Sequence, residues 1–160
     1  MLKNNLILSV KEYSISLSLP AVNRILFLFI GTMLTIGIVF SEKAADRMWI
    51  PVLLALVSAG GAAYTEKWTF DKISTTVTYI RGIAFIPFLR TQKIFTFEEI
   101  SRFRLSEISY TKGKSYCTFS VKLISGKSLE IERGSGKHTC ETIKDNAAYI
   151  SVYCDKKLDK

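Results

Sequence analysis

Two uncharged and strongly apolar runs lie close together in the first 64 residues, and they constrain the fold more than any other feature. Residues 25–40 read ILFLFIGTMLTIGIVF, and residues 48–64 read MWIPVLLALVSAGGAAY. A helix that begins at Ala21, directly after Pro20, would reach Phe40 with a length of about 30 Å, the thickness of the hydrocarbon core of a bilayer. We therefore expect two transmembrane helices that form an antiparallel hairpin.

Residues inside the two runs favour the same interpretation. Trp49 and Tyr64 stand at the ends of the second run, where amphipathic rings favour a membrane interface. Small residues would let the two helices approach closely: Gly31, Thr35, Ser58, Gly60 and Gly61. The alternative is a buried helical hairpin in a soluble protein, which would need a larger core than the roughly 95 remaining residues can supply.

Basic residues on either side of the hairpin predict its orientation. Three precede the first run and three follow the second: Lys3, Lys11, Arg24, Lys67, Lys72 and Arg81. The connector carries Lys43 and Arg47, which Glu42 and Asp46 oppose. Because positive residues gather on the cytoplasmic side, we expect a multi-pass protein of the cell membrane with both termini and the C-terminal domain in the cytoplasm.

After Tyr64 the hydrophobic pattern changes to alternation with a period of two. Six segments show it, and turn-like residues separate them: 67–73, 76–83, 92–97, 101–110, 116–124 and 128–133. Such alternation is typical of half-buried antiparallel strands. An N-terminal stretch, EYSISLSL, alternates in the same way. It could lie along the membrane surface, but we favour its pairing with an edge of the sheet.

The C-terminal region changes pattern again. Between residues 139 and 158 the apolar side chains fall three and four positions apart, which predicts one amphipathic helix. We expect Ile143, Ala147 and Ile150 to pack on the strands, while Lys144 and Asp145 point away. A single helix of this kind can cap the open end of a small, bent barrel.

A resemblance to known proteins rests on four segments that follow the two predicted apolar helices: EKWTFDK, TTVTYIRGI, KIFTFEEI and FSVKLISGKSLEI. The chain resembles bacterial membrane proteins that have two transmembrane helices and a pleckstrin-homology-like (PH-like) domain. This resemblance implies a membrane-anchored α+β protein of the bacterial inner membrane. A transmembrane helical hairpin would precede a small antiparallel PH-like barrel or sandwich, capped by the C-terminal helix. The expected divisions are an N-terminal strand or interfacial segment (1–20), the hairpin (21–64) and the PH-like domain (65–160).

Charge gives a weaker signal about partners. The net charge of +8 and the pI near 9.4 suit an anionic surface, but basic residues alternate with acidic ones, so we expect no nucleic acid. PH domains that bind lipid carry basic residues in their first strand loop, where this chain has Lys72 alone. A second group of lysines lies in or beside predicted turns: Lys112, Lys114, Lys127 and Lys137. The default interpretation is that these lysines are solvated. The alternative is that they form a basic rim that contacts lipid headgroups or other anions.

The stretch ERGSGKHTC superficially resembles a phosphate-binding loop. It does not meet the pattern, because Ile131 stands where the first glycine is needed and His138 follows Lys137 in place of Ser or Thr. We expect a flexible approach to the last helix, with Thr139 as its N-cap. A small anion at this helix start remains an alternative.

No catalytic constellation is evident in the sequence. His138 is the only histidine and has no evident partner. Glu98 and Glu99 are adjacent, so in a strand they would point to opposite faces; we expect both to face solvent in a turn. The sequence predicts a protein that is not an enzyme and uses no cofactor or metal.

The three cysteines, Cys117, Cys140 and Cys154, are an odd number without close pairing in the sequence. This spacing argues against a disulfide framework and against a zinc site. We expect buried thiols in a reducing compartment.

The resulting functional expectation is a membrane-anchored scaffold or docking protein. Its PH-like domain would bind another membrane or cytoplasmic protein, and the chain could form a homo-oligomer. The alternative is a sensor that recognises anionic lipid headgroups through basic turns.

Overall fold

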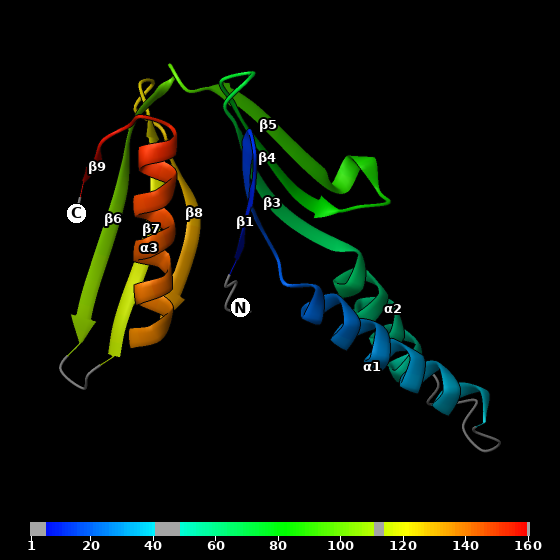
Figure 1. The fold of residues 1–160 in the computed structure, drawn as a ribbon. Coiled ribbons are helices and arrows are strands. Elements are labelled where there is room, and N and C mark those ends of the chain that lie inside the picture. Colours follow the sequence, from blue (N-terminus) through cyan, green and yellow to red (C-terminus); the bar gives the residue numbers. More distant parts are fainter. Residues whose placement is uncertain (1–5, 41–48, 111–113, 160) are drawn as a thin grey trace. The chain divides into compact units, whose positions relative to one another are not determined.

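A computed structural model describes residues 6–40, 49–110 and 114–159, and the chain divides into two compact units (Figure 1). The larger unit comprises Met1–Leu19, Lys67–Ile80 and Gln92–Lys160. The smaller unit comprises Pro20–Glu66 and Arg81–Thr91. The fold is α+β, with antiparallel pairing in both sheets and an apolar helix near the N-terminus.

Two sheets contain the strands. The first has five strands in the order β1-β2-β3-β4-β5, which span Ile7–Lys11, Ser14–Ser18, Tyr64–Asp71, Thr76–Ile83 and Arg90–Thr96. The second has four strands in the order β8-β7-β6-β9, which span Ser128–Ser135, Lys114–Leu123, Ile100–Tyr110 and Leu158–Asp159. The six strands predicted after Tyr64 are therefore confirmed.

Of the barrel or sandwich that we expected, a closed barrel does not form, because the two sheets stay open. After β5 the chain turns through Phe97, Glu98 and Glu99, and β6 begins the second sheet without pairing with β5. The Glu99 carboxylate fixes this turn by accepting a hydrogen bond from the Thr96 amide at 2.8 Å. Consequently, each sheet keeps two edge strands within the described part of the chain.

The N-terminal segment pairs with the sheet, as favoured from its alternation. Strand β2 runs antiparallel to β3, with Ile15 opposite Phe70 and Leu17 opposite Trp68. All four side chains are fully buried. Strand β2 therefore contributes to the core of the larger unit and does not form a separate interfacial segment.

Aromatic side chains connect the two sheets through a shared core. Trp68 of β3 stacks on Tyr79 of β4, with ring centroids 4.3 Å apart. Phe70 of β3 meets Phe103 of β6 edge to face at 6.3 Å. Because Phe70 and Phe103 come from different sheets, this contact joins the two sheets without strand pairing.

Helix α3 spans Lys137–Tyr153 and packs against β6, β7 and β8 (Figure 1). Ile143, Ala147 and Ile150 are fully buried, so the predicted stripe is confirmed. The helix covers a sheet face instead of capping a barrel. It also ends before residue 158, where β9 runs parallel to β6.

The start of α3 also differs from the prediction. Its N-cap is Gly136, in the left-handed region with φ +98°, and Thr139 lies inside the helix. Gly134 permits the close approach of helix and strand, because a Cβ there would lie 2.3 Å from the Thr139 Cγ2 atom. The glycines of ERGSGKHTC therefore serve chain geometry and packing.

The expectation of three unpaired cysteines is wrong for two of them. Cys117 of β7 and Cys140 of α3 form a disulfide, with Cα atoms 5.4 Å apart. The pairing arises because α3 packs directly on β7, which brings together residues 23 positions apart. Cys154 is a free, buried thiol, as expected.

The smaller unit contains α1 (Ala21–Val39) and α2 (Trp49–Ala63), which pack on each other. Their contact uses three of the predicted small residues, Gly31, Ser58 and Gly61. A Cβ on Gly61 would lie 2.7 Å from the Phe27 ring, and one on Gly31 would lie 3.4 Å from the Ser58 Cβ. Within the described ranges, α1 is the one helix long and apolar enough to cross a membrane; α2 has 15 residues.

Candidate functional site

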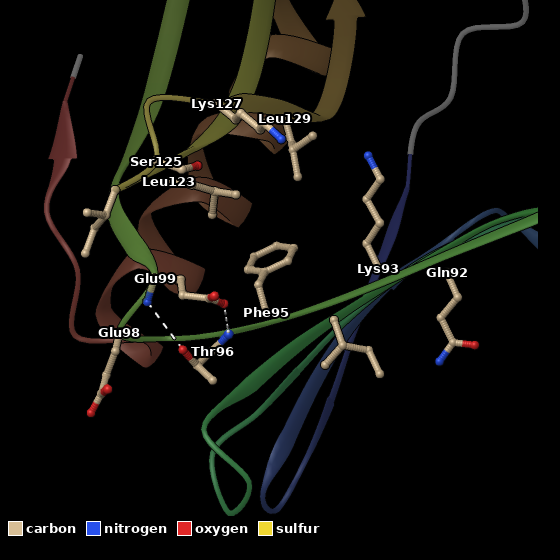
Figure 2. A pocket seen from close by; sticks show the side chains of 12 residues that line it. Gln92, Lys93, Phe95, Thr96, Glu98, Glu99, Leu123, Ser125, Lys127 and Leu129 are labelled. Carbon is tan, nitrogen blue, oxygen red and sulfur yellow. Dashed lines mark hydrogen bonds between the residues drawn. The ribbon is translucent and has the colours of Figure 1, made fainter.

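An open groove in the larger unit, with a volume of about 990 Å³, runs between β5 and the turn that joins β7 to β8. Figure 2 shows its two walls. One wall is β5 and the turn after it, and the other is formed by the end of β7, the turn and the start of β8. Its lining residues are Gln92, Lys93, Ile94, Phe95, Thr96, Glu98, Glu99, Leu123, Ile124, Ser125, Lys127 and Leu129.

Alternation along β5 gives the groove an apolar floor with a charged margin. Lys93 and Phe95 project from the same side of β5, toward Leu129 and Lys127 of the opposite wall (Figure 2). Phe95 packs edge to face on Trp68, with ring centroids 6.3 Å apart, and is nearly buried. The floor of the groove is therefore continuous with the hydrophobic core, while the lysines remain exposed.

The backbone of β5 adds a second feature to this groove. In the order of the first sheet, β5 has β4 as its one neighbour among the described strands. Its other edge presents backbone N–H and C=O groups that no strand in this part of the chain pairs. An edge of this kind can take an extended peptide as an additional strand, with alternate side chains of the peptide directed into a neighbouring pocket.

The adjacent carboxylates Glu98 and Glu99 have different surroundings. Both lie in the turn after β5 and are exposed, as expected. The Glu99 carboxylate accepts the Thr96 amide, and the Glu99 amide donates to Thr96 Oγ1 at 3.4 Å. Glu98 points away from this pair of bonds (Figure 2). Glu99 therefore fixes the shape of one end of the groove.

The lysines singled out in the sequence whose backbone the structure describes are spread along the length of β7. Lys127 lines the groove at one end of β7, whereas Lys114 begins that strand at its other end. Lys137 is the exposed first residue of α3 and lies near the start of β7, because the Gly136 amide donates to the Ser115 carbonyl at 2.9 Å. Lys112 lies outside the described residues.

A different basic patch lies on the second sheet and was missed in the sequence. It comprises Arg102 and Arg104 of β6, Lys122 of β7 and Lys157, with Asp159 as the one carboxylate lining the same hollow. Asp159 forms an ion pair with Arg102 at 2.8 Å. The signal in the sequence was the alternation of SRFR, which places both arginines on one face, but Lys122 and Lys157 join them only through strand pairing.

A buried carboxylate, Glu132, holds the N-terminus to the second sheet. Its Oε1 accepts the Leu6 amide at 3.0 Å, and its Oε2 accepts the Asn146 side-chain amide at 3.3 Å. Burial raises the pKa of Glu132 above its ordinary value of 4.5, and the two hydrogen bonds oppose part of this shift. Glu132 has a structural role, since it joins three separate segments.

Within the described ranges, no three His, Cys, Asp or Glu side chains gather as they would around a metal ion. His138 is exposed near the start of α3. Burial raises the pKa of the Cys154 thiol to about 12, so this thiol stays neutral. No protein-family model matches the chain, and no curated protein matches it either.

Proposed function

We propose that this protein is a membrane-anchored docking protein that performs no catalysis. Helices α1 and α2 hold the chain in a bilayer, and the groove beside β5 binds an extended segment of another protein. The observation that carries the proposal is the unpaired edge of β5 next to a groove with an apolar floor. This arrangement supplies both parts of strand addition, backbone pairing and side-chain pockets.

The membrane part of the proposal rests on the surface of α1 and on strand pairing. No residue of α1 is buried, although the helix carries no charge after Arg24 and is mostly apolar from there to its end at Val39. Strand β2 precedes α1, β3 follows α2, and the two strands pair. Both ends of the helical pair therefore lie on one side of a membrane, which requires a hairpin. Helix α2 is about 22 Å long at ~1.5 Å per residue, so flanking residues must complete its crossing.

The proposal places both termini and the larger unit in the cytoplasm of a bacterial cell, from the distribution of basic residues. The Cys117–Cys140 disulfide argues for the opposite side, because disulfides persist mainly in oxidising compartments. A Ser41→Cys variant decides between the two with a membrane-impermeant maleimide; position 41 lies outside the described residues. Labelling of intact cells supports the cytoplasmic placement, and labelling only after permeabilisation reverses it. The parent chain is the negative control, because its native cysteines are buried.

Docking at the groove can be tested by site-specific photo-crosslinking in native membranes. A photoreactive amino acid at Ile94, which lines the groove and is 62% exposed, should give a discrete crosslinked product. The same residue at Val152, which is 81% exposed on α3, should not. Lys93→Glu with Lys127→Glu should abolish the product. The matched double reversal Arg104→Glu with Lys137→Glu should retain it, and equal loss in both would overturn the groove as the docking site.

The basic patch on the second sheet supports the alternative function, recognition of anionic lipid headgroups. Its four cations face one carboxylate, which leaves an excess of positive charge. Short-chain phosphatidylglycerol titrated into the full chain in zwitterionic detergent should then bind more tightly than phosphatidylcholine. Arg104→Glu with Lys122→Glu should abolish this preference, whereas Lys93→Glu with Lys127→Glu should preserve it. No preference in the parent chain would exclude the alternative.

A further inference from the structure

The loop between β4 and β5, residues 84–89 with the sequence AFIPFL, exposes large apolar side chains in the smaller unit. Phe88 is 86% exposed and Phe85 is 84% exposed, the two highest values among the exposed large hydrophobic residues described. Leu89 is 49% exposed. Exposed apolar groups that lie together usually mark an interaction surface.

The loop has a fixed shape. The Ile86 amide donates to the Ile83 carbonyl at 3.2 Å, and the Leu89 amide donates to the Ile86 carbonyl at 3.0 Å. Pro87 begins a short 3₁₀ helix between them. At the neck, Gly82 has φ +138°, and a Cβ there would lie 2.0 Å from the Leu89 carbonyl oxygen. The two phenylalanines are therefore presented by a closed, internally bonded loop.

This loop is bonded to the end of the helical pair. The Ala84 amide donates to the carbonyl of Ala63, the last residue of α2, at 2.9 Å. All residues involved belong to the same compact unit. The loop therefore begins beside the end of α2, where that helix passes into β3.

Polar groups surround the same junction. Arg81, just before the loop, donates to the Tyr64 hydroxyl at 2.8 Å, and Arg24 in the first turns of α1 donates to Thr65 Oγ1 at 3.1 Å. Arg90 follows the loop directly and is exposed. Arginine and tyrosine are residues that favour the headgroup level, where long basic side chains reach anionic lipid while their stems stay in apolar surroundings.

We propose that residues 84–89 form a third membrane contact, in which Phe85 and Phe88 insert into the interfacial layer of the bilayer that α1 and α2 cross. Arg81 and Arg90 then lie among anionic headgroups. The proposal rests on the membrane anchoring described under the proposed function. A lipid surface is the occupant that the observations favour, because the loop is bonded to the end of a helix whose exposed residues are themselves apolar.

Spin-label depth measurements on the full chain test this contact. The chain is reconstituted in vesicles of phosphatidylcholine and phosphatidylglycerol, with labels introduced one at a time as Phe85→Cys and Phe88→Cys. Leu28→Cys, in the middle of α1, is the positive control, and Ile124→Cys, 71% exposed in the larger unit, is the aqueous control. Each label is compared for collisions with oxygen, which concentrates in lipid, and with a water-soluble nickel chelate.

The expected result is that labels at positions 85 and 88 collide more with oxygen than with the nickel chelate, as at position 28, while position 124 shows the reverse. If position 28 is in lipid and positions 85 and 88 are in water, the loop proposal is overturned and the anchoring stands. If position 28 is itself in water, the anchoring fails and the loop proposal fails with it. If the collision rates of the labels at positions 85 and 88 change only when a second protein is added, the loop contacts a protein partner instead.

Discussion

Helices α1 and α3 have similar lengths, 19 and 17 residues, but their surfaces are used in opposite ways. Helix α3 buries a single stripe against the second sheet, and its remaining faces are polar or exposed. Helix α1 is mostly apolar, with no charge after Arg24, and buries no residue. The difference shows that apolar content alone does not identify a core helix. A stripe predicts a protein partner within the fold, whereas a helix that is mostly apolar and still exposed agrees with the apolar medium, a bilayer, that we propose around it.

The largest expected effect concerns that medium. We predict that the full chain stays in the membrane pellet through salt and alkaline carbonate washes and is released only by detergent. The reason is that exposing the apolar surface of α1 and α2 to water is far less favourable than leaving it in lipid. Recovery of the intact chain in the carbonate supernatant would remove the contrast between α1 and α3.

A single substitution should separate the two faces of α3. Ile150→Asp places a charge in the fully buried stripe and should lower the free energy of unfolding of the larger unit by about 3–5 kcal/mol. Val152→Asp introduces the same side chain at an 81% exposed position two residues away and should change it by less than about 0.5 kcal/mol. Thermal melting of the full chain in detergent measures both.

Two features of the structure determine the choice of the full chain and of the control variant in this experiment. A fragment that begins at Glu66 would lose the buried side chains of Ile15 and Leu17, so the full chain is needed. Lys144 would be a poor control, because it forms an ion pair with Glu107 at 2.8 Å. Equal melting of the Ile150→Asp and Val152→Asp variants would show that α3 does not pack on the sheet.

The disulfide provides a covalent test of the same helix. Reduction, or a Cys117→Ser change, should lower the free energy of unfolding by about 3 kcal/mol, the effect expected when a loop of this size is no longer closed. Alkylation of the denatured chain gives an independent count: one thiol should react without reductant and all three after reduction. Three reactive thiols without reductant would show that the cysteines are unpaired and would agree with a reducing compartment.

The smallest effect concerns Glu132. Because burial raises its pKa, the folded chain holds this proton more tightly than the unfolded chain does. Its contribution to stability is complete below the ordinary pKa of 4.5 and is lost as the pH rises through the raised value. Glu132→Gln should remove this part of the pH dependence of stability. Denaturant unfolding midpoints measured from about pH 4 to neutral pH would show the change. Glu141→Gln, at an exposed position of α3, should leave the dependence unchanged.

Hydrophobic periodicity was sufficient to predict the helices and strands, but not how the strands assemble into sheets. The alternation of residues such as Trp68 and Phe70 shows which face is buried, and the spacing of Ile143, Ala147 and Ile150 predicts the stripe of α3. Neither pattern shows which strand edges meet, so the sequence could not decide between a barrel and a sandwich, and the structure has two open sheets. Edge pairing depends on turns, here the one held by Glu99.

The candidate sites depended on contacts distant in the sequence. The groove joins Lys93 to Lys127, and the basic patch joins Arg102 to Lys157, through strand order that no local pattern specifies. The disulfide likewise required the packing of α3 on β7. Lys127, one of the four lysines singled out in the sequence, lines the groove, whose lining residues include none of the other three.

The hydrogen bond between Leu6 and Glu132 has a consequence for the synthesis of the chain. Its two residues are 126 positions apart, an interval that a ribosome adds in roughly 6–25 s at ~5–20 residues per second. During this time both apolar helices emerge, and β2 must wait for β3, leaving Ile15 and Leu17 without their final neighbours. Strands β1 and β2 therefore leave the ribosome well before their final surroundings exist, and their apolar side chains stay open to aggregation during this interval.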